Sequence, residues 1–100
     1  MNAKLSKEEF ITKLKKLDQA TSAKDDVIYN HFHFDDIYIR GIRNKKDGTT
    51  ASFRIKSEKL HQAYCAQDEH NTKSLKKYVS GVQSPALAIL LAAGLTKYKK

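Results

Sequence analysis

The sequence predicts an α+β domain in which a small antiparallel sheet packs against one N-terminal helix and three C-terminal helices. Segments near both ends carry apolar residues every three or four positions, which is typical of amphipathic helices. The middle of the chain alternates apolar and polar residues around the turn signal Asp47-Gly48, as a β-hairpin does. One hundred residues with 40% hydrophobic content are enough for one domain, residues 1–100.

The first helix is marked by its start. Ser6 is followed three residues later by Glu9, which is the pattern of a capping box. Apolar residues then recur at helical spacing, and they predict a helix over residues 7–17. Residues 20–26 are expected to form a polar connector.

Residues 27–34 predict a first strand, because Val, Ile, Tyr and Phe dominate the segment. Its alternation does not continue into Ile37, so a tight turn is expected at Asp35-Asp36. A hairpin over residues 37–56 then completes a sheet of three strands.

The hairpin contains a break in its alternation. Ile39 and Ile42 cannot both face inward in a regular strand, and a bulge at Gly41 would restore the pattern by turning Ile42 inward and Arg43 outward. In the second strand, Ala51, Phe53 and Ile55 are expected to face inward. The predicted outer face consists of Tyr38, Arg40, Arg43, Ser52, Arg54 and Lys56.

Three helices follow the hairpin. Ser57 is expected to cap a helix over residues 58–67, and Thr72 a short helix that ends before Gly81. Ser84 should open the last helix, whose residues 86–93 are apolar on every side. A helix without a polar face is expected to be buried, here against the inner face of the sheet. Residues 96–100 form a basic tail that need not be ordered.

The distribution of charge favours an anionic partner. The formal net charge is +8, and residues 37–59 hold seven basic against two acidic side chains. All three arginines, Arg40, Arg43 and Arg54, belong to the hairpin. Arginine presents a planar fork of donors that suits phosphates and base edges. The sequence therefore predicts a small non-enzymatic module that binds nucleic acid, DNA or RNA, through Tyr38, Lys56 and these arginines, with no cofactor.

Two other functional classes stay open. A protein-interaction or homodimerisation module would use apolar residues near the C-terminus, namely Leu87, Leu91, Leu95 and Tyr98. A metal-dependent phosphodiester hydrolase would use His31, His33 and Asp35, which share a face of a regular strand and are residue types that bind catalytic metals.

The location predicted from the sequence is cytoplasmic. A single cysteine, Cys65, excludes an intrachain disulfide and fits a reducing compartment. The N-terminal segment has no apolar signal core. The longest apolar run, residues 86–93, is far shorter than the ~20 residues needed to cross a bilayer, so no membrane partner is expected.

Overall fold

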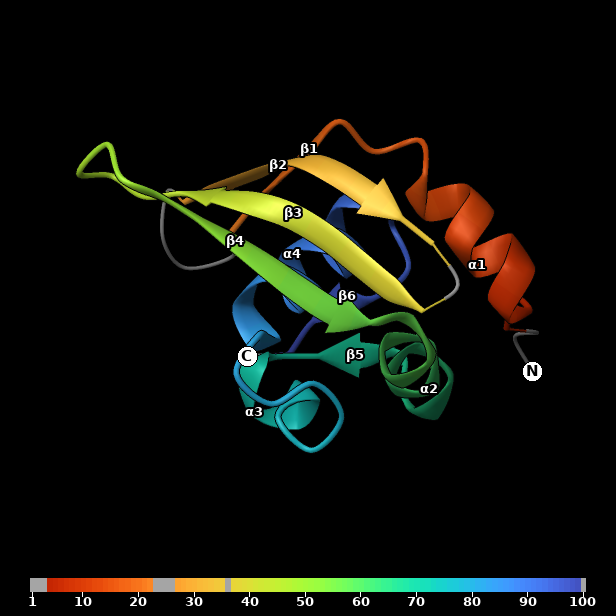
Figure 1. Cartoon of the computed structure of the whole chain (residues 1–100). Helices are drawn as coiled ribbons and strands as arrows, with labels where there is room; N and C mark the ends of the chain where they lie inside the picture. Colours follow the sequence, from red (N-terminus) through yellow and green to blue (C-terminus); the bar gives the residue numbers. More distant parts are fainter. Residues whose placement is uncertain (1–3, 23–26, 36, 100) are drawn as a thin grey trace.

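The predicted α+β class is confirmed by the structure, a computed structural model that describes residues 4–22, 27–35 and 37–99 (Figure 1). The elements follow one another as α1 (Lys7–Leu14), β1 (Gln19–Thr21), β2 (Ile28–Phe34), β3 (Tyr38–Asn44), β4 (Thr50–Lys56), α2 (Ser57–Ala66), β5 (Glu69–His70), α3 (Thr72–Leu75), α4 (Gln83–Ala92) and β6 (Lys97–Tyr98). The one N-terminal and three C-terminal helices are those expected.

The main sheet has four antiparallel strands in the order β1-β2-β3-β4. The sequence predicted three of them. β1 overlaps the start of the segment expected to be a polar connector, residues 20–26. It forms there because Ala20 pairs with Tyr29 and is buried with it. Residues 23–26 of that connector and Asp36 of the predicted turn lie outside the described residues.

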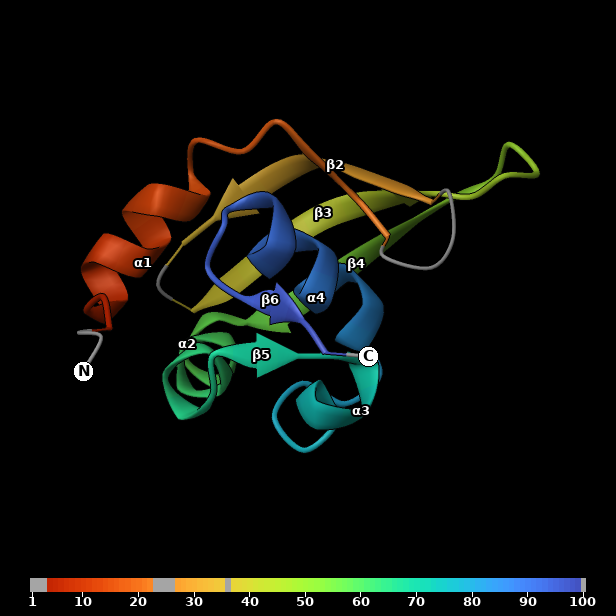
Figure 2. The same cartoon turned by 180° about the vertical axis from the view of Figure 1, so that it is seen from behind.

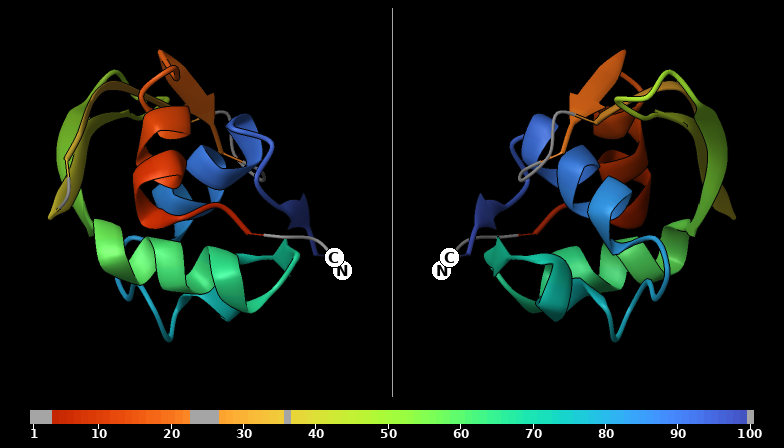
Figure 3. Two further views of the ribbon diagram at one scale, coloured as in Figure 1. Left: turned by 90° about the vertical axis from the view of Figure 1, so that its right-hand side faces the viewer. Right: turned by 90° about the vertical axis from the view of Figure 1, so that its left-hand side faces the viewer.

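Helix α4 occupies the centre of the molecule. The sheet curves over one side of it, while α1, α2 and α3 lie on other sides (Figures 1 and 3). Its residues from Pro85 to Leu90 are all buried, as expected for a helix without a polar face. The helix ends at Ala92, and Gly94 follows its C-cap with a φ of 70° that lets the amide of Leu95 donate to the carbonyl of Leu90, 3.0 Å away.

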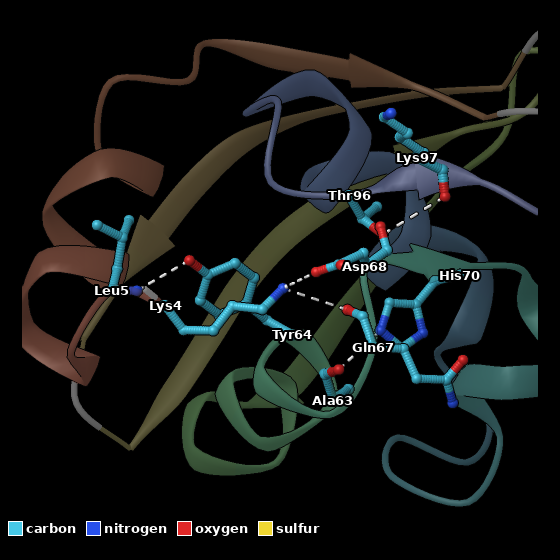
Figure 4. A network of polar contacts seen from close by, with 9 residues as sticks. All are labelled: Lys4, Leu5, Ala63, Tyr64, Gln67, Asp68, His70, Thr96 and Lys97. Carbon is cyan, nitrogen blue, oxygen red and sulfur yellow. Dashed lines mark hydrogen bonds and ion pairs between the residues drawn. The ribbon is translucent and has the colours of Figure 1, made fainter. Parts of the chain in front are cut away.

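The segment before α1 is tied to α2 (Figure 4). The capping box of Ser6 and Glu9 is confirmed, and the helix ends at Leu14 instead of residue 17. The amide of Leu5 donates to the Tyr64 hydroxyl at 2.9 Å. The Lys4 ammonium lies over the Tyr64 ring and reaches the Asp68 carboxylate at 2.6 Å.

Three predicted helix caps are wrong, because each hydroxyl side chain lies just inside its helix. α2 has Lys56 at its N-cap, and the Ser57 hydroxyl donates instead to the carbonyl of Asp35 at 2.7 Å. Asn71 caps α3 in place of Thr72. The Ser84 hydroxyl forms a hydrogen bond with the Tyr29 hydroxyl, 2.9 Å away, and so connects α4 to the sheet.

The basic C-terminal segment pairs with the middle of the chain. β5 and β6 form a parallel two-stranded ladder on the far side of the molecule from the main sheet (Figures 2 and 3). The amide of Lys97 donates to the carbonyl of Asp68, and that of Lys99 to the carbonyl of His70.

His70 is a fully buried polar side chain beneath this ladder. Its Nε2 lies 2.7 Å from the Ala63 carbonyl oxygen, and its Nδ1 lies 2.9 Å from the Ser74 hydroxyl. A neutral imidazole can satisfy both contacts by donating from Nε2 and accepting at Nδ1. Burial lowers the pKa of His70 below its ordinary value of 6.5, more than the Ala63 hydrogen bond raises it.

A β-bulge lies in β2, and the predicted bulge at Gly41 is wrong. Between Asn30 and His33, β2 has one more residue than the opposite part of β3. The extra residue is His31, which has a left-handed φ of 53°. β3, by contrast, pairs with β4 in unbroken register. The change of phase therefore occurs one strand earlier than the sequence indicated.

Gly41 is required for space. A Cβ atom there would lie 2.6 Å from Cζ of Phe53 and 2.9 Å from Cδ1 of Phe32. Both rings are half-buried and pack against the core. Glycine lets the two rings lie directly over β3.

The first prediction concerns this contact. Gly41→Ala should lower the free energy of unfolding by overpacking, which typically costs about 1–3 kcal/mol. That cost exceeds the roughly 0.5–1 kcal/mol that alanine regains in backbone entropy. Urea denaturation measures the difference. Ser52→Ala, at an exposed position of β4, is the control and should stay within about 0.5 kcal/mol of wild type. An unchanged Gly41→Ala midpoint would contradict the close approach.

The second prediction follows from His70. Because its folded-state pKa is lowered, the unfolded chain takes up a proton first as the pH falls below 6.5. The free energy of unfolding should be fully retained above that pH and decline as the pH drops towards the folded-state pKa. Urea titrations between about pH 7 and pH 5 should show a weaker pH dependence for His70→Gln. Ser52→Ala, which removes no titratable group, should keep the wild-type dependence. An equal pH dependence in His70→Gln and in the wild type would contradict the assignment to His70.

Candidate functional site

The outer face of the main sheet has no second layer over it in the part of the chain that the structure describes. Seen end-on, the sheet forms one side of the molecule, and the helices lie behind it (Figure 3). The β3–β4 hairpin also extends beyond the helices at its tip (Figure 1). Side chains that point away from α4 are therefore presented directly to solvent.

The register places five of the six residues of the predicted outer face on this side of the sheet, namely Tyr38, Arg40, Ser52, Arg54 and Lys56. Tyr38 pairs with Lys56, and Arg40 pairs with Arg54, while the intervening Ile39 is buried. The guanidinium carbon of Arg54 lies 4.5 Å from the centre of the Tyr38 ring, and that of Arg40 lies 5.8 Å from it. Both distances are within the range of cation–π attraction. The two arginines thus gather around one half-exposed tyrosine.

Neither arginine forms an ion pair within residues 4–22, 27–35 and 37–99. The ion pairs found there join Lys4 to Asp68 and His33 to Asp35, and none involves Arg40 or Arg54. Both residues are exposed, so an anion can approach them from solvent.

Arg43 does not join them, and its predicted outward orientation is wrong. It pairs with Tyr29 on one side and Ala51 on the other, so it lies on the inner face of the sheet. Its Nε atom is buried and has no hydrogen-bond partner among the described residues. Ile42 takes the outward position, opposite Ser52.

Asp35 holds the chain where β3 begins. Its Oδ1 accepts hydrogen bonds from the amides of Tyr38 at 2.6 Å and Ile37 at 2.9 Å. These two backbone donors, with smaller contributions from the charges of His33 and Arg40, lower the pKa of Asp35 below 3.8. The carboxylate therefore stays ionised and fixes the backbone that carries the Tyr38 ring.

The candidate metal residues do not converge. His33 Nε2 lies 3.7 Å from Asp35 Oδ2, but the bulge places His31 apart from them along β2. No group of three histidine, cysteine, aspartate or glutamate side chains in the described ranges could hold a metal ion. The regular strand that would align the three residues is interrupted at His31 itself.

The apolar residues proposed for self-association are largely covered. Leu87 and Leu95 are buried in the core, and Leu91 and Tyr98 are half-buried against it. The larger exposed apolar side chains of the described chain are instead Ile28 and Ile37. They lie apart, at the start of β2 and just before β3.

The sequence did not indicate that the loop after α3 would lie beside β4. There, Tyr78 and Ser80 line a hollow together with Tyr38, Arg54 and Lys59. Lys77 lies 5.6 Å from the centre of the Tyr78 ring. These residues share no sequence pattern with the hairpin, so only the tertiary packing, in which α3 contacts α4, brings them together.

Comparisons with known proteins leave the chain without a matching relative: no family model, curated protein or solved structure is significantly similar to it. None of the described helices combines the length and apolar character needed to cross a bilayer.

The third prediction tests how Asp35 positions Tyr38. In Asp35→Ala, the amide protons of Ile37 and Tyr38 should exchange faster with solvent, because both lose their acceptor; hydrogen exchange followed by NMR measures this. Asp35→Asn retains one acceptor oxygen and should keep part of the protection. In the wild type, the protection should be present above pH 3.8 and decline as the pH falls through the lowered pKa of Asp35.

Asp47→Ala is the matched control. The Asp47 carboxylate accepts hydrogen bonds from the amide and hydroxyl of Thr49 at the hairpin tip. Its removal should speed exchange of the Thr49 amide and leave that of Tyr38 unchanged. Equal exchange of Tyr38 in Asp35→Ala and wild type would show that Asp35 does not hold this turn.

Proposed function

We propose that this protein is a non-enzymatic module that binds nucleic acid through the outer face of the β3–β4 hairpin. The observation that carries the proposal is the pairing of Arg40 with Arg54 around Tyr38, on an uncovered sheet face, with no ion pair to a described acidic residue. Phosphates attract such guanidinium groups, and an exposed tyrosine ring can contact a base or a sugar.

The charge of the whole chain supports the same partner. A net charge of +8 attracts polyanions over a distance set by the ionic strength. Lys56 and Lys59 extend the positive surface from β4 to the beginning of α2. The proposal assumes the cytoplasmic location predicted from the single cysteine.

The fourth prediction compares two faces of the same sheet. Arg40→Gln and Arg54→Gln should each weaken binding to nucleic acid about tenfold at low salt, which corresponds to about 1.4 kcal/mol. Each should also reduce the slope of log affinity against log salt by about 1, because one phosphate contact is lost. Fluorescence anisotropy with labelled single-stranded and duplex oligonucleotides at several salt concentrations provides both values.

Two controls carry the same change of charge. Arg43→Gln alters an arginine of the same strand on the inner face. Lys97→Gln alters a lysine of β6, on the opposite side of the molecule (Figure 3). Both should change affinity much less than the two outer-face substitutions. Equal losses of affinity in all four variants would show that binding depends on net charge alone and not on the outer face. Absence of binding by the wild type would refute the proposal.

A further inference from the structure

Three hollows beside the hairpin share lining residues, and together they are called the track below. The first lies on the sheet between His31 and Arg54, the second between Arg54 and Tyr78, and the third extends to Lys7. Arg54 lines the first two hollows, and Tyr38 lines the second and third. An extended chain could therefore run from the outer face of the sheet, past the edge strand β4, to the beginning of α2.

The middle hollow contains two aromatic rings. Tyr38 and Tyr78 are both half-exposed and line a space of about 320 Å³. This volume is at the lower end of the range for small-ligand pockets, and it suits one planar group better than a rigid helix. A cation lies near each ring, Arg54 at 4.5 Å from the Tyr38 centre and Lys77 at 5.6 Å from the Tyr78 centre. A flat aromatic group next to a negative charge would satisfy both parts of this hollow.

Positive charge continues along the whole track. The cationic side chains that line the three hollows are Lys7, Arg40, Arg54, Lys56 and Lys59. The acidic side chain among the described lining residues is Glu58, in the third hollow. The ligand should thus be an extended polyanion whose charges alternate with flat groups.

We infer that the track binds single-stranded nucleic acid and that the middle hollow accepts one unpaired base between Tyr38 and Tyr78. This inference rests on the proposed function and names its ligand. In a duplex the faces of the bases are stacked on one another, so no base could enter the hollow without being unpaired. A single strand can place its phosphates on the cations and a base against the rings at the same time.

The experiment compares probes of equal length and different structure. Labelled oligothymidine and oligouridine of about 12 nucleotides, a duplex, and a single strand with abasic sites are titrated against the wild-type protein by fluorescence anisotropy. The wild type should bind the thymidine or uridine strand more tightly than both the duplex and the abasic strand. The thymidine and uridine arms distinguish DNA from RNA as the preferred strand.

Substitutions then locate the base. Tyr78→Ala should weaken single-strand binding about tenfold and leave duplex binding nearly unchanged, because stacking is lost while the cations remain. Tyr38→Ala should weaken single-strand binding by a similar factor. Tyr78→Phe and Tyr38→Phe keep the ring and should bind as the wild type does. Because Tyr78 also contacts the core, its alanine variant is checked for folding by circular dichroism. The comparison of the four probes uses the wild-type protein, so its result does not depend on whether a variant folds.

The outcomes separate this inference from the proposed function. Equal or tighter binding of the duplex, or equal binding of the abasic strand, would overturn the single-strand inference. The proposed function would still be supported if Arg40→Gln and Arg54→Gln weakened binding of the duplex. Absence of binding to every probe would refute both.

Discussion

Helix α4 has no polar face, and the arrangement of the other elements follows from the need to surround it. A sheet covers one side, and helices cover the others, because apolar surface left in water costs about 25 cal/mol per Å². The inner face of the sheet is therefore committed to the core through residues such as Ile39 and Ile55. The outer face is left without a covering layer, and Arg40 and Arg54 lie on it. The burial of one helix thus determines which side of the sheet can meet a partner.

Arg43 shows why residue type alone did not define the inner face of the sheet. It lies on that face between Tyr29 and Ala51, and Tyr29 is fully buried in a cluster with Ala88 of α4. The Nε atom of Arg43 is itself buried. Because an arginine can bury its aliphatic stem against apolar neighbours, a charged residue in a strand need not face outward. Ile42, the apolar neighbour of Arg43 in β3, takes the outward position instead.

The sequence contained the signal for the true bulge, in β2. Tyr29 and Phe32 both face the core although they differ by three positions, which a regular strand does not allow. Capping preferences predicted the start of α1 correctly, since Ser6 and Glu9 interact with each other and with local backbone only. The same preferences failed at Ser57 and Ser84, because tertiary partners, the Asp35 carbonyl and the Tyr29 hydroxyl, take these side chains. At α3 the competitor is local, since the neighbouring Asn71 caps the helix in place of Thr72.

By itself the sequence determined the α+β class, the hairpin, the buried last helix and the outward orientation of Tyr38, Arg40, Arg54 and Lys56, because each depends on periodicity within one segment or across one turn. Only the tertiary structure decided which strand carries the bulge and that Arg43 lies on the inner face, apart from Arg40 and Arg54. It also decided that Tyr78 lines the same hollow as Tyr38. The short strands β1, β5 and β6 were also decided only by the tertiary structure, since two or three residues are too few to show an alternation of apolar and polar side chains. The physical reason is common to all: pairing and packing between distant segments select among conformations that local sequence leaves nearly equal in free energy.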